Sequence, residues 1–264
     1  MADTTETFQI PLEAAEMYES HFVPRLFARW AARLVDVAGV GEGQRVLDIA
    51  CGTGAVARAA EERTDQVTGL DVNEAMLTVA RRLRPNLQWR RGDAGELPFP
   101  AASFDVVLCQ AALMFFPDPE RALREMGRVL APSGTVGVQV WDRREDQPAY
   151  RPFIEVVGRH AGPEAVNLIA AYFVRGDLAE LTAMLASARL EVTGTRSEST
   201  TMRFSSVDEL VATEVQSTPL GERLDEDVIR RIIEGSRDAL RSFQTEQGEL
   251  DIPIGGHIVT ARKR

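Results

Sequence analysis

The chain has 264 residues, 44% of them hydrophobic, and carries a formal net charge of −10. That length and apolar content are enough for one sizeable hydrophobic core with a small cap, and the negative charge disfavours nucleic acid as a partner, because nucleic-acid binders present a basic face. Two cysteines are too few for a disulfide framework or for a metal site built from cysteine, so both are excluded.

Residues 8–40 form the first predicted helical region. Apolar side chains recur there near helical spacing, and Pro24 is expected to interrupt the helix. Tyr18 and Phe22 belong to this apolar stripe. Such a stripe is typical of a helix face packed on a core, and equally of one that covers a ligand.

A glycine turn follows the first predicted strand. The apolar run 46–50, interrupted only by Asp48, is typical of a strand covered on both faces. Gly52 and Gly54 lack a Cβ atom, so the turn can adopt unusual backbone angles and a ligand can approach the main chain. Helix-forming residues occupy 55–62, and we expect the amides at the start of that helix to face the same ligand.

A second predicted strand, 67–70, ends at Asp71, where a carboxylate can accept hydrogen bonds from both hydroxyls of a ribose. Two cofactor classes fit this pattern. The run 52–57 matches the G-x-G-x-x-A dinucleotide fingerprint, which favours NAD. Asp48 disfavours NAD, because a carboxylate just ahead of the glycines would repel a pyrophosphate. The same carboxylate suits the ammonium and sulfonium groups of S-adenosylmethionine (SAM), which has no phosphate.

The first half of the chain alternates predicted strands with predicted helices. This alternation favours parallel pairing and a doubly wound α/β sheet, whose ligands bind beyond the carboxyl ends of the strands. The predicted elements are strand 45–49, helix 54–63, strand 66–70, helix 74–83, strands 87–91 and 104–109, helix 118–130 and strand 134–141.

The second half begins with a polar loop at 143–148. The helical segments after it carry Tyr150, His160 and Tyr172. The remaining predicted elements are helix 177–188, strand 190–204, helices near 206–215 and 225–247, and strand 254–262.

Five ordered segments resemble motifs of the class I SAM-dependent methyltransferases, especially the ubiquinone/menaquinone-biosynthesis-like (type 11) group. These segments are 46–54, 70–77, 92–99, 103–110 and 118–134. One departure is Ser133-Gly134, where Gly-Gly is common, and it affects only a turn. The resemblance implies a Rossmann-like seven-stranded sheet, mostly parallel with a C-terminal antiparallel hairpin, plus a helical lid and cap.

The resemblance also implies the cofactor site. Asp71 would bind the ribose, Met76 would cover the adenine, and Asp93 would meet the adenine amino group. The full set of implied cofactor residues is Tyr18, Asp48, Ala50, Cys51, Gly52, Gly54, Asp71, Val72, Met76, Gly92, Asp93, Ala94, Gln110 and Ala111. No metal is expected, because no metal-spaced cluster of His, Asp or Glu is visible.

We expect a single methyltransferase domain over residues 1–264. Its parts are an N-terminal helical lid (1–40), a SAM-binding core (41–142), a substrate-side insertion (143–176), and the C-terminal part of the sheet with cap helices (177–264). No apolar stretch is long enough to cross a bilayer, and residues 1–6 show no basic-then-apolar leader pattern. We therefore expect a cytoplasmic protein without a membrane partner.

Phe22, Tyr150, His160 and Tyr172 are the candidate substrate contacts, with ordinary core packing as the open alternative for each. His21, on the lid, is the candidate catalytic base, because histidine side chains titrate near neutral pH; a structural histidine is its open alternative.

The predicted function is SAM-dependent methyl transfer to a carbon or oxygen of a small, apolar or aromatic metabolite, with S-adenosylhomocysteine (SAH) as product. Two alternatives stay open. One is a SAM-binding regulatory protein without turnover, and the other is an NAD-dependent oxidoreductase. A monomer or homodimer is expected.

Overall fold

A seven-stranded sheet forms the centre of the computed structural model, which describes residues 10–216, 218, 220, 221 and 223–264. The strand order is β3-β2-β1-β4-β5-β7-β6. The strands are β1 (Val46–Ile49), β2 (Val67–Asp71), β3 (Gln88–Arg91), β4 (Phe104–Gln110), β5 (Leu130–Trp141), β6 (Leu190–Phe204) and β7 (Leu250–Lys263). Residues 8 and 9 of the predicted first helix, and residues 1–6, lie outside the described residues.

The sheet is mixed, as the sequence predicts. Strands β1 to β5 pair in parallel, while β7 runs antiparallel to both β5 and β6. The strand order reverses between β1 and β4, which lie side by side although β2 and β3 separate them in the chain. In sheets of this kind, the crevice beyond the carboxyl ends of the strands at such a reversal binds the ligand. The predicted fold class is confirmed.

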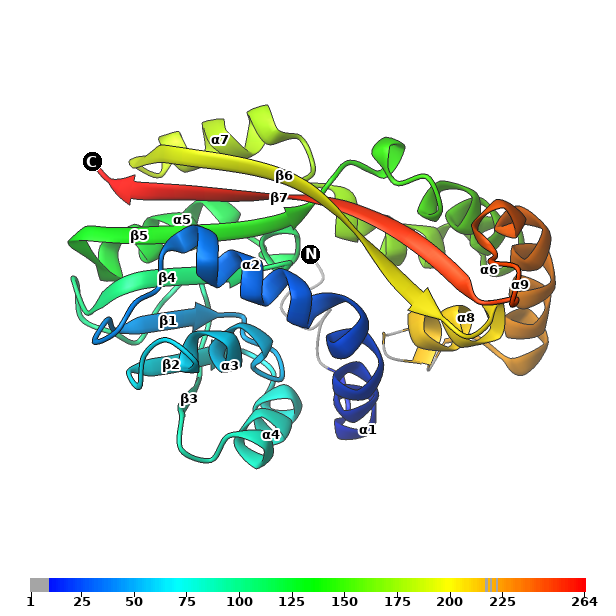
Figure 1. The fold of residues 1–264 in the computed structure, drawn as a ribbon, viewed down its shortest axis with the longest axis horizontal. Coiled ribbons are helices and arrows are strands. Elements are labelled where there is room, and N and C mark those ends of the chain that lie inside the picture. The colour runs from blue at the N-terminus through cyan, green and yellow to red at the C-terminus, as the bar shows by residue number, and fades with distance from the viewer. Residues whose placement is uncertain (1–9, 217, 219, 222) are drawn as a thin grey trace.

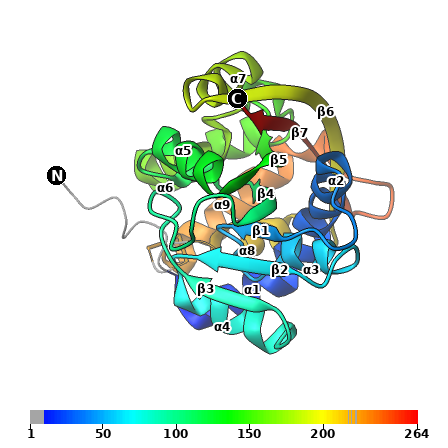
Figure 2. The ribbon, with the colours of Figure 1, turned by 90° about the vertical axis from the view of Figure 1, so that its left-hand side faces the viewer.

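Helices cover both faces of the sheet (Figure 1, Figure 2). Helices α2 (Ala28–Ala38), α3 (Ala55–Glu61) and α4 (Glu74–Leu83) lie on one face, and α5 (Pro119–Val129) and α7 (Leu178–Ser187) lie on the other. Local signals set their starts: the side chain of Asn73 caps α4, and Asp118 with Pro119 begins α5. The core lies between these layers and includes the fully buried Leu47 and Leu108.

The N-terminal segment stays helical through Pro24, contrary to the predicted interruption. Helix α1 (Leu12–Met17) continues into a π-helix, η2 (Tyr18–Phe27), which leads directly into α2. Pro24 lies inside the π-helix, and a proline has no N–H to donate in a regular α-helical turn. The wider i→i+5 pattern therefore carries the chain past the proline without ending the helix.

A helical cap stands beside one end of the sheet. It contains α6 (Tyr150–Ala170), kinked at Gly162 and Pro163, together with α8 (Val207–Gln216) and α9 (Glu226–Ala239). Short 3-10 turns lie between other elements: η3 (Leu113–Phe115) between β4 and α5, η4 (Arg144–Asp146) between β5 and α6, η5 (Ala171–Phe173) between α6 and α7, and η6 (Arg241–Phe243) between α9 and β7. The predicted helix 225–247 is too long, because regular helical geometry ends at Leu240.

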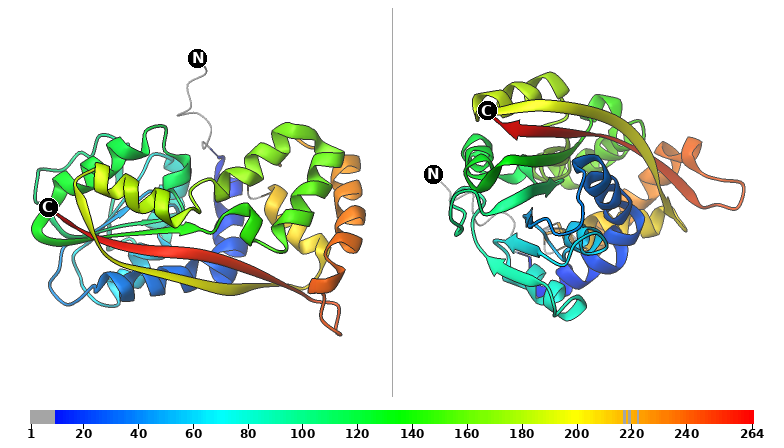
Figure 3. Two further views of the ribbon diagram at one scale, coloured as in Figure 1. Left: turned by 90° about the horizontal axis from the view of Figure 1, so that it is seen from above. Right: turned by 60° about the vertical axis from the view of Figure 1, so that its left-hand side comes forward.

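Strands β6 and β7 connect the sheet to the cap as one long hairpin (Figure 1, Figure 3). Their pairing runs from Leu190 opposite Lys263 to Phe204 opposite Leu250. Strand β5 accompanies β7 only as far as Gly256, so the rest of β7 pairs with β6 alone. This pairing explains why the last strand begins at Leu250, earlier than the predicted residue 254.

Candidate active site

A cavity of about 240 Å³ lies where the carboxyl ends of β1, β2 and β4 meet the N-terminal helices and the cap. Most of the predicted site residues line it: Tyr18, Phe22, Ala50, Gly52, Asp71, Val72, Met76, Gly92, Asp93, Ala94, Gln110, Ala111, Tyr150 and Tyr172. Most of the cofactor motif residues and three of the four predicted substrate contacts, Phe22, Tyr150 and Tyr172, therefore share one cavity.

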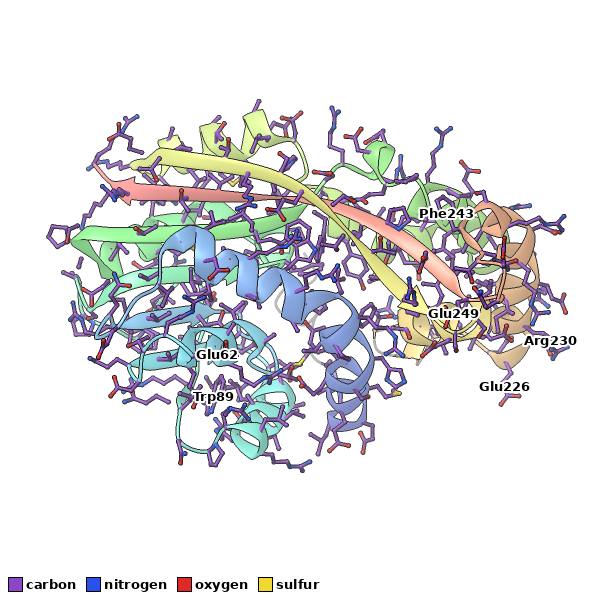
Figure 4. The ribbon with its side chains drawn as sticks, viewed as in Figure 1. Glu62, Trp89, Glu226, Arg230, Phe243 and Glu249 are labelled. Atoms are coloured by element: carbon purple, nitrogen blue, oxygen red, sulfur yellow. The ribbon has the colours of Figure 1, made fainter. Side chains whose placement is uncertain are left out.

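The glycine turn follows β1 and is held by main-chain hydrogen bonds. The Cys51 amide donates to the Leu70 carbonyl (3.0 Å), and the Gly54 amide donates to the Cys51 carbonyl (2.8 Å). Gly54 has φ +90°, and a Cβ there would lie 2.4 Å from the ring of Trp89. Trp89 lies at the β3 edge of the molecule, far from Glu226 and Arg230 on α9 (Figure 4). A glycine at position 54 therefore permits both the positive φ of the turn and the close packing against Trp89.

Two alanines at neighbouring strand ends also adopt left-handed backbone angles. Ala50, after β1, has φ 52° and Ala111, after β4, has φ 48°. Left-handed geometry costs a residue with a Cβ roughly 1–2 kcal/mol. Both residues line the cavity. Two of the four described non-glycine residues with positive φ thus lie where the strand order reverses, a placement common at ligand sites; the other two are Ala102 and Arg189.

Asp71 is a cavity carboxylate whose two oxygens both accept main-chain amides. One oxygen accepts the Gly52 amide and the other accepts the Asn73 amide, each at 2.8 Å. Burial raises the pKa of Asp71, and these amide hydrogen bonds oppose that rise. A carboxylate oxygen has about two acceptor sites, so each Asp71 oxygen can still accept a hydroxyl group. The arrangement fits the ribose of an adenosyl cofactor.

Tyr18 covers the glycine turn from the N-terminal π-helix. A Cβ on Gly52 would lie 3.8 Å from the Tyr18 ring. The Tyr18 ring centroid lies 5.1 Å from that of Phe27, and Phe27 in turn lies 6.0 Å from Trp141. Burial raises the pKa of Tyr18 well above its usual value, so its hydroxyl stays protonated. These rings close one side of the cavity.

Polar contacts fasten this helix over the turn. Arg58 donates to the Thr53 carbonyl (2.7 Å) and to the Glu19 carboxylate (2.9 Å). The Gln110 amide donates to the Phe27 carbonyl at 3.0 Å. These hydrogen bonds join the π-helix to the glycine turn and to the end of β4, so the helix covers this side of the cavity.

The other end of the cavity is aromatic and belongs to the cap. Tyr172 packs edge-on against Phe115 at 5.7 Å, and Tyr150 packs against Phe173 at 5.1 Å, both measured between ring centroids. The Tyr150 hydroxyl donates to Glu214 Oε1 at 2.5 Å. Burial raises the pKa of Glu214 to about 7, and the hydrogen bond from Tyr150 opposes that rise. An apolar ring with one polar group would suit these walls.

Asp48 and Cys51 are not among the described residues that line the cavity. Asp48, only 1% exposed, accepts the Ala57 amide at 2.9 Å, and burial raises its pKa to about 8. Its carboxylate fastens α3 onto β1, and its predicted contact with the ammonium group of SAM stays a prediction. The Cys51 sulfur points toward Gly69 of β2, 3.0 Å from a Cβ built there. Gly54 is likewise outside the lining.

The two histidine candidates also lie outside the described lining. Nδ1 of His21 lies 3.0 Å from the Met17 carbonyl and 2.9 Å from the Ser20 hydroxyl, so it contacts its own helix. Nε2 of His160 lies 3.5 Å from a Cβ built on Gly235, so it faces α9. Neither position suits contact with a reacting group.

Sequence reasoning missed several lining residues, above all Glu214. Its signal was present: Glu214 follows Leu210 by four residues and Val211 by three, so it shares the apolar face of α8. Phe115, Trp141 and other ring-bearing residues were equally unassigned, because only the fold brings their elements together.

No group of three or more His, Cys, Asp or Glu side chains in the described part of the chain is arranged to hold a metal ion. Among the same residues, no helix has the length and apolar character needed to cross a membrane.

Comparisons with known proteins agree with this geometry. Residues 47–138 match the family model described as "Methyltransferase domain". The demethylmenaquinone methyltransferase of Renibacterium salmoninarum is 38% identical over 125 residues, which are 47% of this chain and 51% of that protein. The chain thus spans about half the length of the curated relatives it matches.

Solved structures share the fold over most of the chain. YcgJ of Bacillus subtilis has a TM-score of 0.61 at 23% identity and covers 89% of this chain and 99% of its own. The [4+2]-cyclase SpnF has a TM-score of 0.56 at 23% identity, with 89% and 80% covered. At this identity the likeness concerns the fold alone. The family match covers residues 47–138, and this segment supports a class I SAM-dependent methyltransferase domain with SAM as its cofactor.

Proposed function

We propose that the protein transfers the methyl group of SAM to a carbon or oxygen of a small, largely apolar aromatic molecule. One observation carries this proposal: a single cavity joins the predicted cofactor motifs at the strand ends to a wall of aromatic side chains in the cap. The two reactants of a methyl transfer need such a shared space, because the acceptor must approach the methyl group in line with the breaking bond.

Asp71 would bind the ribose hydroxyls, while Val72 and Met76 would enclose the adenine and Asp93 would accept its amino group. This assignment is supported by the positions of all four side chains on the cavity wall. The amide of Gly52 is already engaged by Asp71, so the ribose and the glycine turn are coupled through one carboxylate. Gln110 and Ala50, at the ends of β4 and β1, lie where the methionine part would extend.

Phe22, Tyr150 and Tyr172 would contact the acceptor. When bound, SAM supplies an electrophilic methyl group, so the protein has mainly to orient the acceptor and exclude water. The ring cluster around Tyr172, Phe115 and Phe173 supports both tasks, since it is apolar and close-packed. Orientation of this kind can lower the barrier by roughly 7–11 kcal/mol.

Calorimetric titration with SAM, SAH and NAD in parallel tests the cofactor assignment. We expect binding of both adenosyl compounds and none of NAD. A screen of small aromatic acceptors with methyl-labelled SAM then tests transfer. Binding of SAM with no transfer to any acceptor would favour the regulatory alternative, and binding of NAD alone would overturn the proposal.

A monomer or homodimer, a cytoplasmic location and the lack of a nucleic-acid partner stay predictions. The net charge of −10 supports the last of these. Size-exclusion chromatography with light scattering measures the oligomeric state directly.

A further inference from the structure

Glu214 is a buried carboxylate, and its second oxygen lacks a hydrogen-bond partner among the described residues. The residue has 0% exposure and lines the cavity from α8. Its Oε1 accepts the Tyr150 hydroxyl at 2.5 Å. Its Oε2 is buried and has no hydrogen-bond partner among the residues that the structure describes.

Packing alone does not account for this side chain. Its neighbours on the same helix face, Leu210 and Val211, are apolar, and an apolar residue at 214 would extend that face. Burying a carboxyl group without full hydrogen bonding is costly, so such groups are rare outside functional sites. Glu214 therefore points to a ligand group that donates a hydrogen bond.

The aromatic surroundings narrow that group to one carried on a ring. Tyr172 and Tyr150 line the cavity beside Glu214, and Tyr18 lines it from the cofactor side. These are all three tyrosines of the chain. A flat, apolar molecule suits such rings, and a hydroxyl on it is the kind of donor that the unpartnered carboxylate oxygen lacks.

We propose that Oε2 of Glu214 accepts a hydrogen bond from a hydroxyl group of an aromatic acceptor and takes its proton during methyl transfer. The substrate class is thus a hydroxylated aromatic molecule, and the inference rests on the methyltransferase function proposed above. In the step, the acceptor O–H bond breaks and the proton passes to Oε2. The electron pair stays with the phenolate and forms the bond to the methyl carbon, while the pair of the breaking S–C bond returns to sulfur. Sulfonium and carboxylate charges disappear together.

The pH behaviour of the site agrees with this role. Burial raises the pKa of Glu214 to about 7, so the carboxylate is available near neutral pH and can still hold a proton. The titratable groups that face it are Tyr150, on α6, and Tyr172, on η5; burial and the Glu214 charge raise the pKa of both. Both tyrosines stay neutral where Glu214 titrates.

A matched pair of probes tests the hydrogen bond: 1-naphthol, which has a hydroxyl donor, and 1-methoxynaphthalene, which has none. Calorimetry is run on the full chain saturated with SAH. We expect the wild type to prefer 1-naphthol by roughly 10- to 100-fold above pH 7, because the bond goes to a charged acceptor. The preference should weaken as the pH falls below about 7, where Glu214 gains its proton.

Glu214→Gln should reduce the preference by about tenfold and remove its pH dependence, since a neutral amide is a weaker acceptor that does not titrate. The matched control is Asp208→Asn, on the same helix, whose side chain is half exposed and pairs with Arg237. It should behave as wild type. Tyr150→Phe keeps the carboxylate but removes the hydrogen bond that lowers its pKa, so it should keep the preference and shift its midpoint to higher pH.

The outcomes separate the two proposals. A protein that does not bind SAH contradicts the proposed function itself. A protein that binds SAH but binds both naphthalenes equally, or neither, overturns only the role of Glu214. Full preference with unchanged pH dependence in Glu214→Gln would overturn it as well. If that variant does not fold, the wild-type pH profile and Tyr150→Phe still decide.

Discussion

The two ends of the cavity are built in opposite ways. At the cofactor end, short neighbouring segments supply the wall, and the Asp71 carboxylate is engaged by main-chain amides of Gly52 and Asn73. At the acceptor end, α6, η5 and α8 each bring one or two side chains, and Glu214 keeps one oxygen unpartnered among the described residues. One end is preorganised by the backbone, and the other is defined by side chains.

The fold therefore constrains the cofactor site more strongly than the acceptor site. A cofactor site made of strand ends and amides cannot change without disturbing the sheet. An acceptor site made of cap side chains can change by substitution. One fold can therefore host different activities through changes in its cap.

The largest expected effect is at the cofactor end. Asp71→Ala removes the ribose acceptor and leaves the Gly52 and Asn73 amides without their partner. We expect SAH affinity to fall roughly 100-fold or more, as for loss of several charge-assisted hydrogen bonds. Calorimetry measures the change, and Asp65→Ala, at an exposed acid before the opposite end of β2, is the control. Unchanged SAH affinity in Asp71→Ala would contradict the ribose assignment.

Gly54→Ala tests the packing beneath that end. The new Cβ would lie 2.4 Å from the Trp89 ring at φ +90°, so strain and overpacking add. The free energy of unfolding should fall by about 2–4 kcal/mol in urea titrations. Gly43→Ala has a similar φ of +75° but open space around it, and should lose only the strain, about 1 kcal/mol. Equal losses in the two variants would argue against the Trp89 contact.

At the acceptor end, Glu214→Gln tests how burial of the carboxylate affects the free energy of unfolding. The pKa of Glu214 is raised from 4.5 to about 7 in the folded protein. Between these pH values the unfolded chain releases the proton first, so wild-type stability falls as the pH rises. The variant lacks this penalty and should exceed the wild type by up to about 3 kcal/mol at pH 8, with little difference at pH 4. Urea unfolding at both pH values measures it. If the difference in free energy of unfolding between variant and wild type does not grow with pH, ionisation of Glu214 does not destabilise the folded protein.

The smallest expected effect is at His21, which contacts Met17 and Ser20 of its own helix outside the described cavity lining. His21→Asn should leave the rate of methyl transfer within about threefold of wild type, since such polar surface contacts contribute little. A loss of a hundredfold or more would restore histidine as the base and weaken the case for Glu214.

The sequence predicts the cofactor end well and the acceptor end poorly, for a physical reason. Strand ends, the glycine turn and Asp71 are set by residues close together in the chain, so their spacing carries the signal. Glu214 can be recognised as a site residue only from the folded structure, where it meets Tyr150 of α6, 64 positions away. Pro24 likewise predicts an interruption that the π-helix avoids. Sequence rules that consider only neighbouring residues predict neither a contact between distant segments nor a π-helix.

The hairpin of β6 and β7 also has a consequence for engineering. Phe204 and Leu250 face each other across the two strands. In topological terms, everything between them, α8 and α9 included, is an insertion at a hairpin tip. Such an insertion can be exchanged as a cassette while the paired strands keep its two ends in register. A chimaera that swaps residues 205–249 would therefore replace Glu214 and its helix, and leave the cofactor turn untouched.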